Sequence, residues 1–306
     1  MLSMTDVNAR RCSLPRSKTA ISVERLGKAS PETERQMLLL ITDISTTLRM
    51  ALRLFVVAGP RSFIRKGCPM SLMLEEKIAV SRPPIPAAIQ SYLGNSYPNN
   101  HDYRVVNGKL VPRYKLCMRL RKLQPLYPRN MTSLLDLSCC KGYFVLKAAM
   151  DSHCERVLGI DIHDPDLEAC HAVREHLGLD AEQAQFRKLQ LHELADQIDD
   201  FGGPFQTVLL INMYQYLFFG SSRSPDCYLS HDAILQQVRR VCSGRVIFNN
   251  RMEADRLQDY CRDVAKQRGL EQEYTASRFL EAATKYFRVT PYGKIGRYPL
   301  WALDAR

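Results

Sequence analysis

The sequence predicts an α/β protein with a mostly parallel sheet, a C-terminal antiparallel hairpin strand and a mainly helical N-terminal extension. Three observations support this prediction. From Met131 onward, short apolar runs alternate with helical stretches, which is the rhythm of βαβ units. The last two apolar runs flank a turn that holds Gly293 and Gly296, as in a β-hairpin that adds an antiparallel strand. Before Met131, apolar residues recur at helical spacing in a basic segment.

The composition is that of an ordinary globular protein, with 306 residues of which 45% are hydrophobic. It excludes collagen-like, low-complexity and wholly disordered chains, and a chain of this length buries a sizeable core without disulfides. None of the ten cysteines belongs to a C-x-x-C pair, which argues against a zinc site. Thiols scattered through apolar runs are typical of a reducing compartment, so we expect a cytoplasmic protein without a metal.

Charge is divided unevenly along the chain. Residues 1–130 hold 22 of the 43 Lys and Arg residues but 8 of the 32 Asp and Glu residues, and residues 131–306 hold the other 21 and 24. A basic first part suggests contact with something anionic, such as nucleic acid, acidic lipid or a phosphorylated ligand. A solvated basic surface without a specific partner is the alternative interpretation.

The beginning of the chain has two different patterns. Residues 1–35 are polar and basic without an apolar period, so we expect a disordered tail, with a targeting segment or an over-extended start as alternatives. In residues 36–58, Asp43, Arg49 and Arg53 interrupt an apolar run. We therefore expect an amphipathic helix there and no transmembrane segment.

Residues 36–130 as a whole are predicted to form a helical, basic extension or lid. Their last helix precedes two prolines and has an apolar face and a basic face. The apolar face holds Leu116, Leu120 and Leu123, and the opposite face holds Lys115, Arg119 and Lys122. Two hypotheses follow for this helix. In one, its basic face binds the phosphates of RNA. In the other, the helix is a lid whose apolar face covers the ligand cleft.

Residues 131–306 are predicted to form the βαβ domain. The expected strands are residues 133–137, 157–160, 185–189, 207–211, 245–248, 287–290 and 298–303. The expected helices begin at Tyr143 and cover residues 167–177, 233–241, 254–267 and 278–286. Because helices follow most of the strands, the strands should lie parallel until the terminal hairpin.

The first two strands of this domain each end in an acid. The segment 134–144 reads LLDLSCCKGYF, so an apolar strand ends at Asp136, small residues follow and Gly142 opens a helix. Ligands of open α/β sheets bind at the carboxyl ends of the strands, where small residues let the backbone approach closely. The second strand ends at Asp161, whose carboxylate is placed to accept hydrogen bonds from a ribose diol.

These motifs resemble the class I S-adenosylmethionine-dependent methyltransferases, which have a Rossmann-like fold, over about Met131 to Arg306. The segment 205–217, FQTVLLINMYQYL, and the terminal hairpin also resemble that family. The resemblance implies S-adenosyl-L-methionine as the cofactor. It assigns Asp136, Ser138, Cys140 and Gly142 to the methionine moiety, Asp161 and Ile162 to the ribose, Gln190 and Leu191 to the adenine, and Asn212 to the vicinity of the methyl group.

Three positions depart from the family pattern. Ser138 and Cys140 replace the first two of three glycines, and Gln206 stands where an acid usually follows the aromatic residue of the fourth strand. Small side chains still admit a close ligand, so two alternatives stay open: a methyltransferase subfamily or a non-catalytic adenosyl-binding protein. A dinucleotide-binding dehydrogenase is disfavoured because the chain lacks a G-x-G-x-x-G turn.

Methyl transfer requires that the acceptor be positioned and sometimes deprotonated. In the family that the chain resembles, residues after the fourth strand face the methyl group, so Tyr214 and His231 are the catalytic candidates. Aromatic packing for Tyr214 and a position beside a helix cap for His231 are the structural alternatives. On the terminal hairpin, Lys294, Arg297 and Tyr298 are candidates for the acceptor pocket.

The sequence thus predicts a methyltransferase that modifies an oxygen or nitrogen of a small-molecule acceptor. RNA is the alternative acceptor, because the basic extension adjoins the domain. Bacterial methyltransferases that act on the tRNA wobble uridine have a similar layout, with a basic helix followed by this type of domain.

Overall fold

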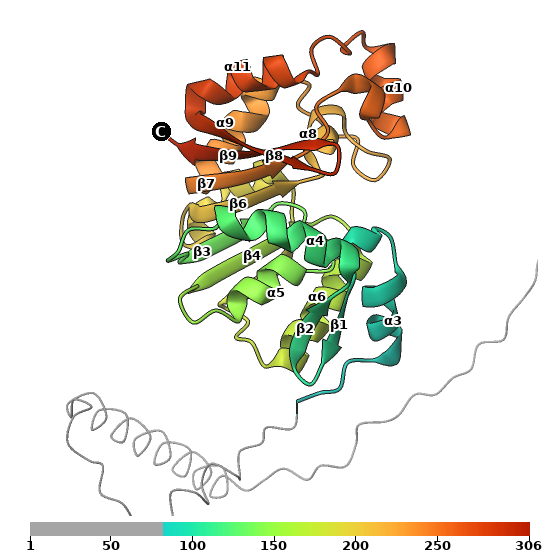
Figure 1. Ribbon diagram of the computed structural model, residues 1–306, viewed down its shortest axis with the longest axis vertical. Helices are drawn as coiled ribbons and strands as arrows, with labels where there is room; N and C mark the ends of the chain where they lie inside the picture. The colour runs from blue at the N-terminus through green and yellow to red at the C-terminus, as the bar shows by residue number, and fades with distance from the viewer. Residues whose placement is uncertain (1–81) are drawn as a thin grey trace, which may run out of the picture. The chain divides into compact units, whose positions relative to one another are not determined.

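A seven-stranded sheet forms the centre of the computed structural model, which describes residues 82–306 (Figure 1). Its strands lie in the order β5-β4-β3-β6-β7-β9-β8. They are β3 (Ser133–Asp136), β4 (Arg156–Asp161), β5 (Ala184–Lys188), β6 (Phe205–Ile211), β7 (Cys242–Asn249), β8 (Phe287–Ile295) and β9 (Tyr298–Ala305). Neighbours are parallel except around β9, which pairs antiparallel with both β7 and β8. The predicted fold class is confirmed, including the C-terminal hairpin strand.

The order in which strands are added to the sheet reverses at β3, the topological switch point of the sheet. Strands β4 and β5 lie on one side of β3, and β6 and β7 lie on the other. The backbone N–H of Leu137 donates to the carbonyl of Leu209 in β6, and that of Cys139 donates to the carbonyl of Ile160 in β4. The turn after β3 is therefore held between two strands, at the edge where open α/β sheets form a ligand crevice.

Helices cover both faces of the sheet. One face packs against α3 (Ala87–Asn95), α4 (Tyr114–Leu123), α5 (Tyr143–Ala149) and α6 (Asp164–Leu177). The other packs against α7 (Leu191–Asp196), α8 (Tyr214–Phe219), α9 (His231–Val241), α10 (Asp259–Gln267) and α11 (Ala276–Tyr286). Successive strand residues point to opposite faces, so Leu134 joins the first core and Leu135 the second. Both are buried, which explains why these strands read as continuous apolar runs.

The chain before the sheet contains a β-hairpin that the sequence analysis did not predict. Strand β1 (Tyr103–Val106) pairs antiparallel with β2 (Lys109–Pro112) across the two-residue turn Asn107-Gly108. Both turn residues have positive φ, as a tight hairpin with an Asn-Gly turn requires. Residues 82–130 are therefore a mixture of helices and a hairpin, and the hairpin lies beside α3 and α4 (Figure 1).

The basic helix of the extension is confirmed as α4, but its basic face differs from the prediction. Lys115 and Lys122 are exposed, as predicted. Arg119 is only 4% exposed, because its guanidinium turns inward and its Nη1 donates to Nε2 of His101 at 2.8 Å. Arg119 therefore does not belong to a surface basic patch.

The predicted helix over residues 254–267 is interrupted. Ala254–Arg256 form a 3₁₀ turn, and α10 begins only at Asp259. Between them the backbone N–H of Gln258 donates to the side-chain oxygen of Gln215 at 3.0 Å, which bends the chain toward α8. Helices α7 and α8 were not predicted, because six residues are too short to display a helical period.

The predicted disordered tail, residues 1–35, and the predicted amphipathic helix within residues 36–58 lie outside the described residues. Between residues 82 and 306, no helix is long and apolar enough to cross a membrane. This same part of the chain brings no three His, Cys, Asp or Glu side chains together as metal ligands.

Candidate functional site

A cavity of about 770 Å³ opens at the carboxyl ends of the parallel strands. Its walls come from the turns after β3, β4, β5 and β6, from the loop of residues 221–228, and from residues 97–101 before β1. This volume is within the range of small-molecule and cofactor sites, roughly 300–1,000 Å³. Seven of the predicted cofactor residues line the cavity: Ser138, Cys140, Asp161, Ile162, Gln190, Leu191 and Asn212.

The turn after β3 is anchored on the acid that ends β4. The backbone N–H of Cys140 donates to Oδ2 of Asp161 at 2.9 Å, and the Ser138 hydroxyl lies 3.4 Å from the same oxygen. Cys140 has a φ of 52°, a left-handed conformation that non-glycine residues rarely adopt. The turn thus keeps the backbone path of a glycine-rich loop although two of the expected glycines are absent.

The carboxylate of Asp161 is fixed at the cavity wall by backbone donors from two loops. Its Oδ1 accepts from the N–H groups of Ile162 at 2.8 Å and His163 at 3.1 Å. Burial raises the pKa of this carboxyl, and the backbone hydrogen bonds oppose that rise because they favour the charged form. The side chain therefore has a single orientation, with hydrogen-bond acceptors beside the cavity.

Two of the predicted cofactor residues lie behind the cavity wall and do not line it. Gly142 is the N-cap residue that precedes α5, and its φ is 74°. A Cβ at this position would come within 2.6 Å of the Cys170 sulfur. This glycine is required by packing. Asp136 is 3% exposed, and its Oδ2 has no hydrogen-bond partner among the described residues. Burial raises the pKa of Asp136 to about 7, although the Ser138 N–H and the Arg119 charge oppose the rise.

The opposite end of the cavity is formed by the start of α7. The side chain of Gln190 forms a capping box with Glu193, whose carboxylate accepts from the Gln190 N–H at 2.6 Å. The Gln190 side-chain oxygen accepts from the hydroxyl of Ser224 at 3.1 Å. The loop of residues 221–228 is thereby joined to the predicted adenine end, where the buried side chain of Leu191 supplies an apolar wall.

The segment before β1 forms part of the site, which the sequence analysis did not predict residue by residue. Lys141, in the turn after β3, is fully buried, and its Nζ donates to Oδ1 of Asp102 at 2.6 Å and to the carbonyl of Ser96 at 2.7 Å. The hydroxyl of Tyr103 donates to the Lys141 carbonyl at 2.7 Å. Residues 97–101 are thereby held against the turn after β3. A lysine within a turn of small residues was the available sequence signal.

Four residues that line the cavity carry a buried polar atom without a partner among the described residues: Asn100 (Oδ1), His101 (Nδ1), Asn212 (Oδ1) and Tyr228 (the hydroxyl). Burial and the nearby Arg119 and Lys141 charges lower the pKa of His101 well below its usual value. The neutral ring accepts from Arg119 at Nε2, so Nδ1 carries the proton and is a free donor. These lining residues therefore keep unused hydrogen-bonding groups of both kinds, donors at His101 and Tyr228 and acceptors at Asn100 and Asn212, which suits a polar ligand.

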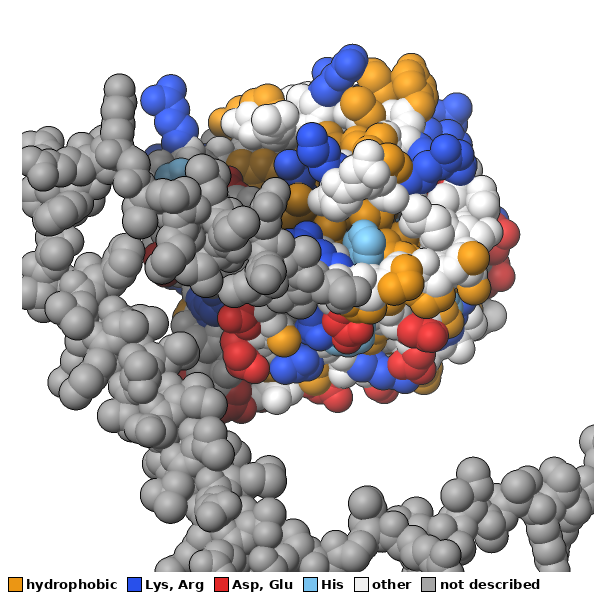
Figure 2. Space-filling view, turned by 90° about the horizontal axis from the view of Figure 1, so that it is seen from below, with side chains coloured by type: hydrophobic (Ala, Val, Ile, Leu, Met, Phe, Trp, Pro, Cys, Tyr) orange, Lys and Arg blue, Asp and Glu red, His pale blue; other side chains and the backbone are white. Residues whose placement is uncertain are grey.

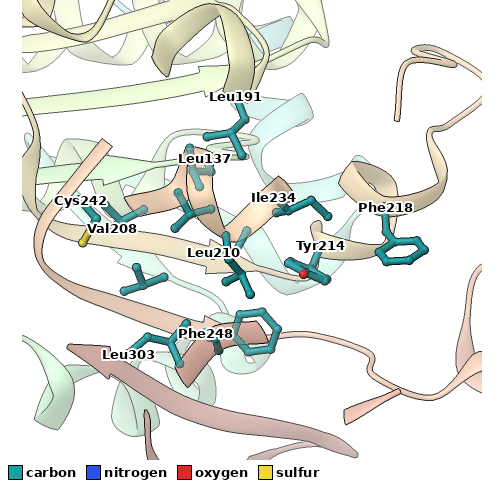
Figure 3. Close-up of a cluster of buried hydrophobic side chains, with 14 of the residues drawn as sticks. Leu137, Leu191, Val208, Leu210, Tyr214, Phe218, Ile234, Cys242, Phe248 and Leu303 are labelled. Carbon is teal, nitrogen blue, oxygen red and sulfur yellow. The ribbon is translucent and has the colours of Figure 1, made fainter. Parts of the chain in front are cut away.

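Tyr214 and His231, the predicted catalytic residues, do not line the cavity. Both are buried, and Figure 3 shows Tyr214 among the apolar side chains Leu210, Ile234 and Phe248. The Tyr214 hydroxyl donates to Nδ1 of His231 at 2.8 Å, and Nε2 of His231 donates to the carbonyl of Glu273 at 3.1 Å. Burial lowers the pKa of His231 to about 4. This geometry supports a structural pair and gives no support to a catalytic role.

The hairpin candidates are also distributed differently from the expectation. Lys294 and Arg297 are exposed and do not line the cavity. Tyr298 does not line it either, but its hydroxyl accepts from Nε of Arg251 at 3.0 Å. Arg251, which follows β7, does line the cavity together with Tyr216 and Gln258.

No protein-family model matches the chain, and no curated protein matches it. Solved structures match at low identity. The EvdMO1 crystal structure is 18% identical over 61% of this chain and 40% of that chain (TM-score 0.43). The N-terminal domain of EvdMO1 with SAH bound is 17% identical over 61% and 80% (TM-score 0.40), and cofactor-bound Rv0187 from MTB is 14% identical over 79% and 98% (TM-score 0.42).

The structure of SMU.776 complexed with SAH is 10% identical over 66% of this chain and 53% of that chain (TM-score 0.42). The chain thus spans about half or less of the full length of EvdMO1 and SMU.776. Likenesses at these identities and scores carry no argument about activity.

Proposed function

We propose that this chain is an S-adenosyl-L-methionine-dependent methyltransferase of the class I, Rossmann-like type that acts on an oxygen or nitrogen of a small-molecule acceptor. The observation that carries the proposal is the anchoring of Asp161. Its carboxylate ends β4, lines the cavity and is bonded to the Cys140 N–H of the turn after β3. A carboxylate held in one orientation, beside a turn of small residues whose backbone a ligand can approach, lies where the strand order reverses. This arrangement suits a ribose diol next to a methionine chain.

The residues of the cavity fit this cofactor along its length. Asp161 would accept from the ribose hydroxyls with Ile162 beside them, and Leu191 would flank the adenine beside the Gln190 amide. At the methionine end, the unpartnered Oδ1 of Asn212 suits the α-ammonium group, and the Nδ1–H of His101 suits the carboxylate. These two groups have opposite hydrogen-bonding character, as the two ends of an amino acid require.

A phosphate-bearing cofactor fits the site less well. A pyrophosphate is normally bound by the N–H groups at the start of the first helix. Here residues 141–144, at the start of α5, are buried and do not line the cavity. The helix N-terminus is therefore covered, which supports a cofactor without phosphate.

When bound, the cofactor supplies an electrophilic methyl group on a sulfonium. The chain's own contribution is to bind, orient and enclose, because in-line displacement depends mainly on the alignment of the acceptor with the methyl group. Asn212, at the end of β6, has a φ of 59° and donates its backbone N–H to the Asn249 carbonyl at 2.8 Å. This contact fixes the strand end that separates the cofactor half of the cavity from the Arg251 half.

RNA is the second candidate acceptor, and one observation favours it. Tyr97, at the cavity, and Tyr114, at the start of α4, are 79% and 78% exposed, and exposed aromatic rings are used to stack unpaired bases. Against it, the visible described residues on the face drawn in Figure 2 show Lys and Arg side chains dispersed among hydrophobic and neutral ones, without one continuous basic patch. The small-molecule acceptor is therefore preferred.

Titration calorimetry of the full chain with S-adenosylmethionine, and then with its demethylated product, tests the proposal. We expect micromolar binding of both and none of NAD at the same concentrations. If neither adenosyl compound bound, the proposed function would be wrong. Binding of both together with methyl transfer to an RNA preparation would keep the cofactor assignment and favour the second acceptor.

A further inference from the structure

Arg251 is an arginine that the fold holds at the cavity wall without an acidic partner. It follows β7, and its backbone carbonyl accepts from the buried Tyr274 hydroxyl at 2.7 Å. Its Nε donates to the Tyr298 hydroxyl at 3.0 Å. In the amide orientation that satisfies its neighbours, the Gln258 oxygen accepts from Nη1 and Nη2 at 2.9 and 3.0 Å. Tyr274 thus fixes the backbone of Arg251, and Tyr298 and Gln258 fix the position of its guanidinium.

These contacts leave part of the guanidinium unused. An arginine has five N–H donors, and Tyr298 and Gln258 take three of them. The other two have no acceptor among the described residues, and no carboxylate of residues 82–306 lies within 4.0 Å. A partly buried charge with neutral partners only is unfavourable unless a ligand supplies the opposite charge.

Arg119 also lacks an acidic partner among the described residues, but it is buried and does not line the cavity. Two partly buried arginines have their charge or donors engaged within the protein. Arg245 lies 2.6 Å from the carboxylate of Asp304, so its charge is paired. Arg156 donates to the backbone carbonyls of residues 201, 203 and 204, so its donors are used in joining loops, and it does not line the cavity. Arg251 differs from both, because it lines the cavity and has donors to spare.

The sheet order separates Arg251 from the proposed cofactor. Asp161 ends β4, whereas Arg251 follows β7, and β3 and β6 lie between these strands. Three strand spacings of about 4.8 Å separate the two positions by roughly 14 Å. With the ribose at Asp161 and the methionine chain near Asn212, the end of β7 is left for the acceptor.

We propose that Arg251 binds an anionic group of the methyl acceptor, a carboxylate or a phosphate, and so selects an acidic small molecule. The inference rests on the proposed methyltransferase function. A guanidinium offers paired N–H donors in a plane, the geometry that matches two oxygens of a carboxylate or phosphate. Tyr298 and Gln258 are positioning residues, because both orient the Arg251 guanidinium through hydrogen bonds. Gln258 lines the cavity, and Tyr298 does not.

The experiment uses the full chain saturated with the demethylated cofactor, at constant ionic strength. Inorganic phosphate and benzoate are titrated separately as probes, with chloride as the reference anion, and binding is followed by calorimetry. We expect one probe to bind, and Arg251→Gln to weaken it at least about tenfold, as for loss of charge-assisted hydrogen bonds. The probe that binds more tightly identifies the anion as phosphate or carboxylate.

Arg262→Gln is the matched control, because Arg262 is a surface residue of α10 paired with Asp259. It should bind the probe as the wild type does. Tyr298→Phe, which removes the partner of Nε but retains the ring, should weaken the probe less than Arg251→Gln does. If Arg251→Gln proved unstable, Tyr298→Phe and Arg251→Lys would give the same comparison with the core contacts intact.

The outcomes separate this inference from the proposed function. Cofactor binding without any probe binding, or probe binding that Arg251→Gln leaves unchanged, would overturn the anion site alone. Loss of cofactor affinity in Arg251→Gln to the same degree as loss of the probe would also overturn it, since Arg251 would then belong to the cofactor half. Probe binding that depends on Arg251 in a chain that binds no adenosyl compound would support the anion site and reject the methyltransferase.

Discussion

Nζ of Lys141 lies 2.6 Å from Oδ1 of Asp102, and both side chains are almost completely excluded from solvent. This ion pair joins the turn after β3 to the segment before β1, which supplies His101 and Asn100 to the cavity. Nearby, the Tyr92 hydroxyl donates to Oδ1 of Asp166 at 3.0 Å, at the start of α6. The segment before β1 and helix α3 are therefore joined to the domain around the end of the cavity that we propose for the cofactor.

The first prediction concerns the strength of this pair. Asp102→Ala should lower the free energy of unfolding by about 3–5 kcal/mol, because it leaves the Lys141 charge buried and unpaired. Denaturant unfolding measures the change. The double variant Asp102→Leu with Lys141→Met should lose less stability than Asp102→Ala alone. A loss of about 1 kcal/mol or less in Asp102→Ala, which is the effect of an average point mutation, would contradict the importance of the pair.

The second prediction concerns the ribose contact. Asp161→Ala should weaken adenosylmethionine binding by about 1.5–3 kcal/mol, the range for hydrogen bonds to a charged group. Titration calorimetry gives the value. Asp151→Ala is the matched control, since Asp151 is an exposed acid of the loop before β4 and should leave the affinity unchanged. Equal affinities in the two variants would remove the ribose assignment.

The third prediction is a pH dependence of stability from Asp136. Its folded-state pKa is raised to about 7, above the unfolded value, so the folded state binds the proton more tightly. Stability from this group is therefore present at acidic pH and decreases as the pH rises from about 4 to about 7, by up to about 4 kcal/mol. Asp136→Asn should abolish this decrease. Parallel pH curves for the two proteins would refute the shift.

The fourth prediction separates a structural from a catalytic role for Tyr214. Tyr214→Phe removes the hydroxyl that donates to His231 and leaves a buried acceptor without a partner, which should cost about 1–3 kcal/mol of stability. Cofactor affinity should stay at the wild-type value, because neither residue lines the cavity. Thermal unfolding and calorimetry on one preparation test both statements, and a selective loss of cofactor binding would restore a role at the site.

The fifth prediction distinguishes the two acceptor classes. A gel-shift with bulk tRNA across salt concentrations should show no micromolar, salt-sensitive binding if the acceptor is a small molecule. If RNA is the acceptor, log affinity should fall with log salt by about 0.7–0.9 per phosphate contact, and Lys115→Glu with Lys122→Glu should flatten that slope. Arg119 is unsuitable for this test, because its substitution would break the buried contact with His101.

Several elements of the fold could be predicted because their signals are local. The strands of the sheet are buried on both faces and read as apolar runs, and the acid at the end of β4 is visible as the last residue of such a run. The turn after β3 was likewise found from its small residues. Position 161 could be assigned to the ligand edge without knowledge of any distant contact, because the carboxyl ends of parallel strands meet there.

The sequence by itself determined the alternation of the seven sheet strands with helices, the antiparallel terminal hairpin and the strand-end acids, since these depend on patterns within about ten residues. Only the tertiary structure decided which side chains reach the cavity. Tyr214 follows β6 as expected but turns into the core with His231, whereas His101, Lys141 and Arg251 take their positions from partners 18, 39 and 47 residues away in the chain. Such pairs form because packed helices and strands bring remote segments together, and no period in the sequence records that packing.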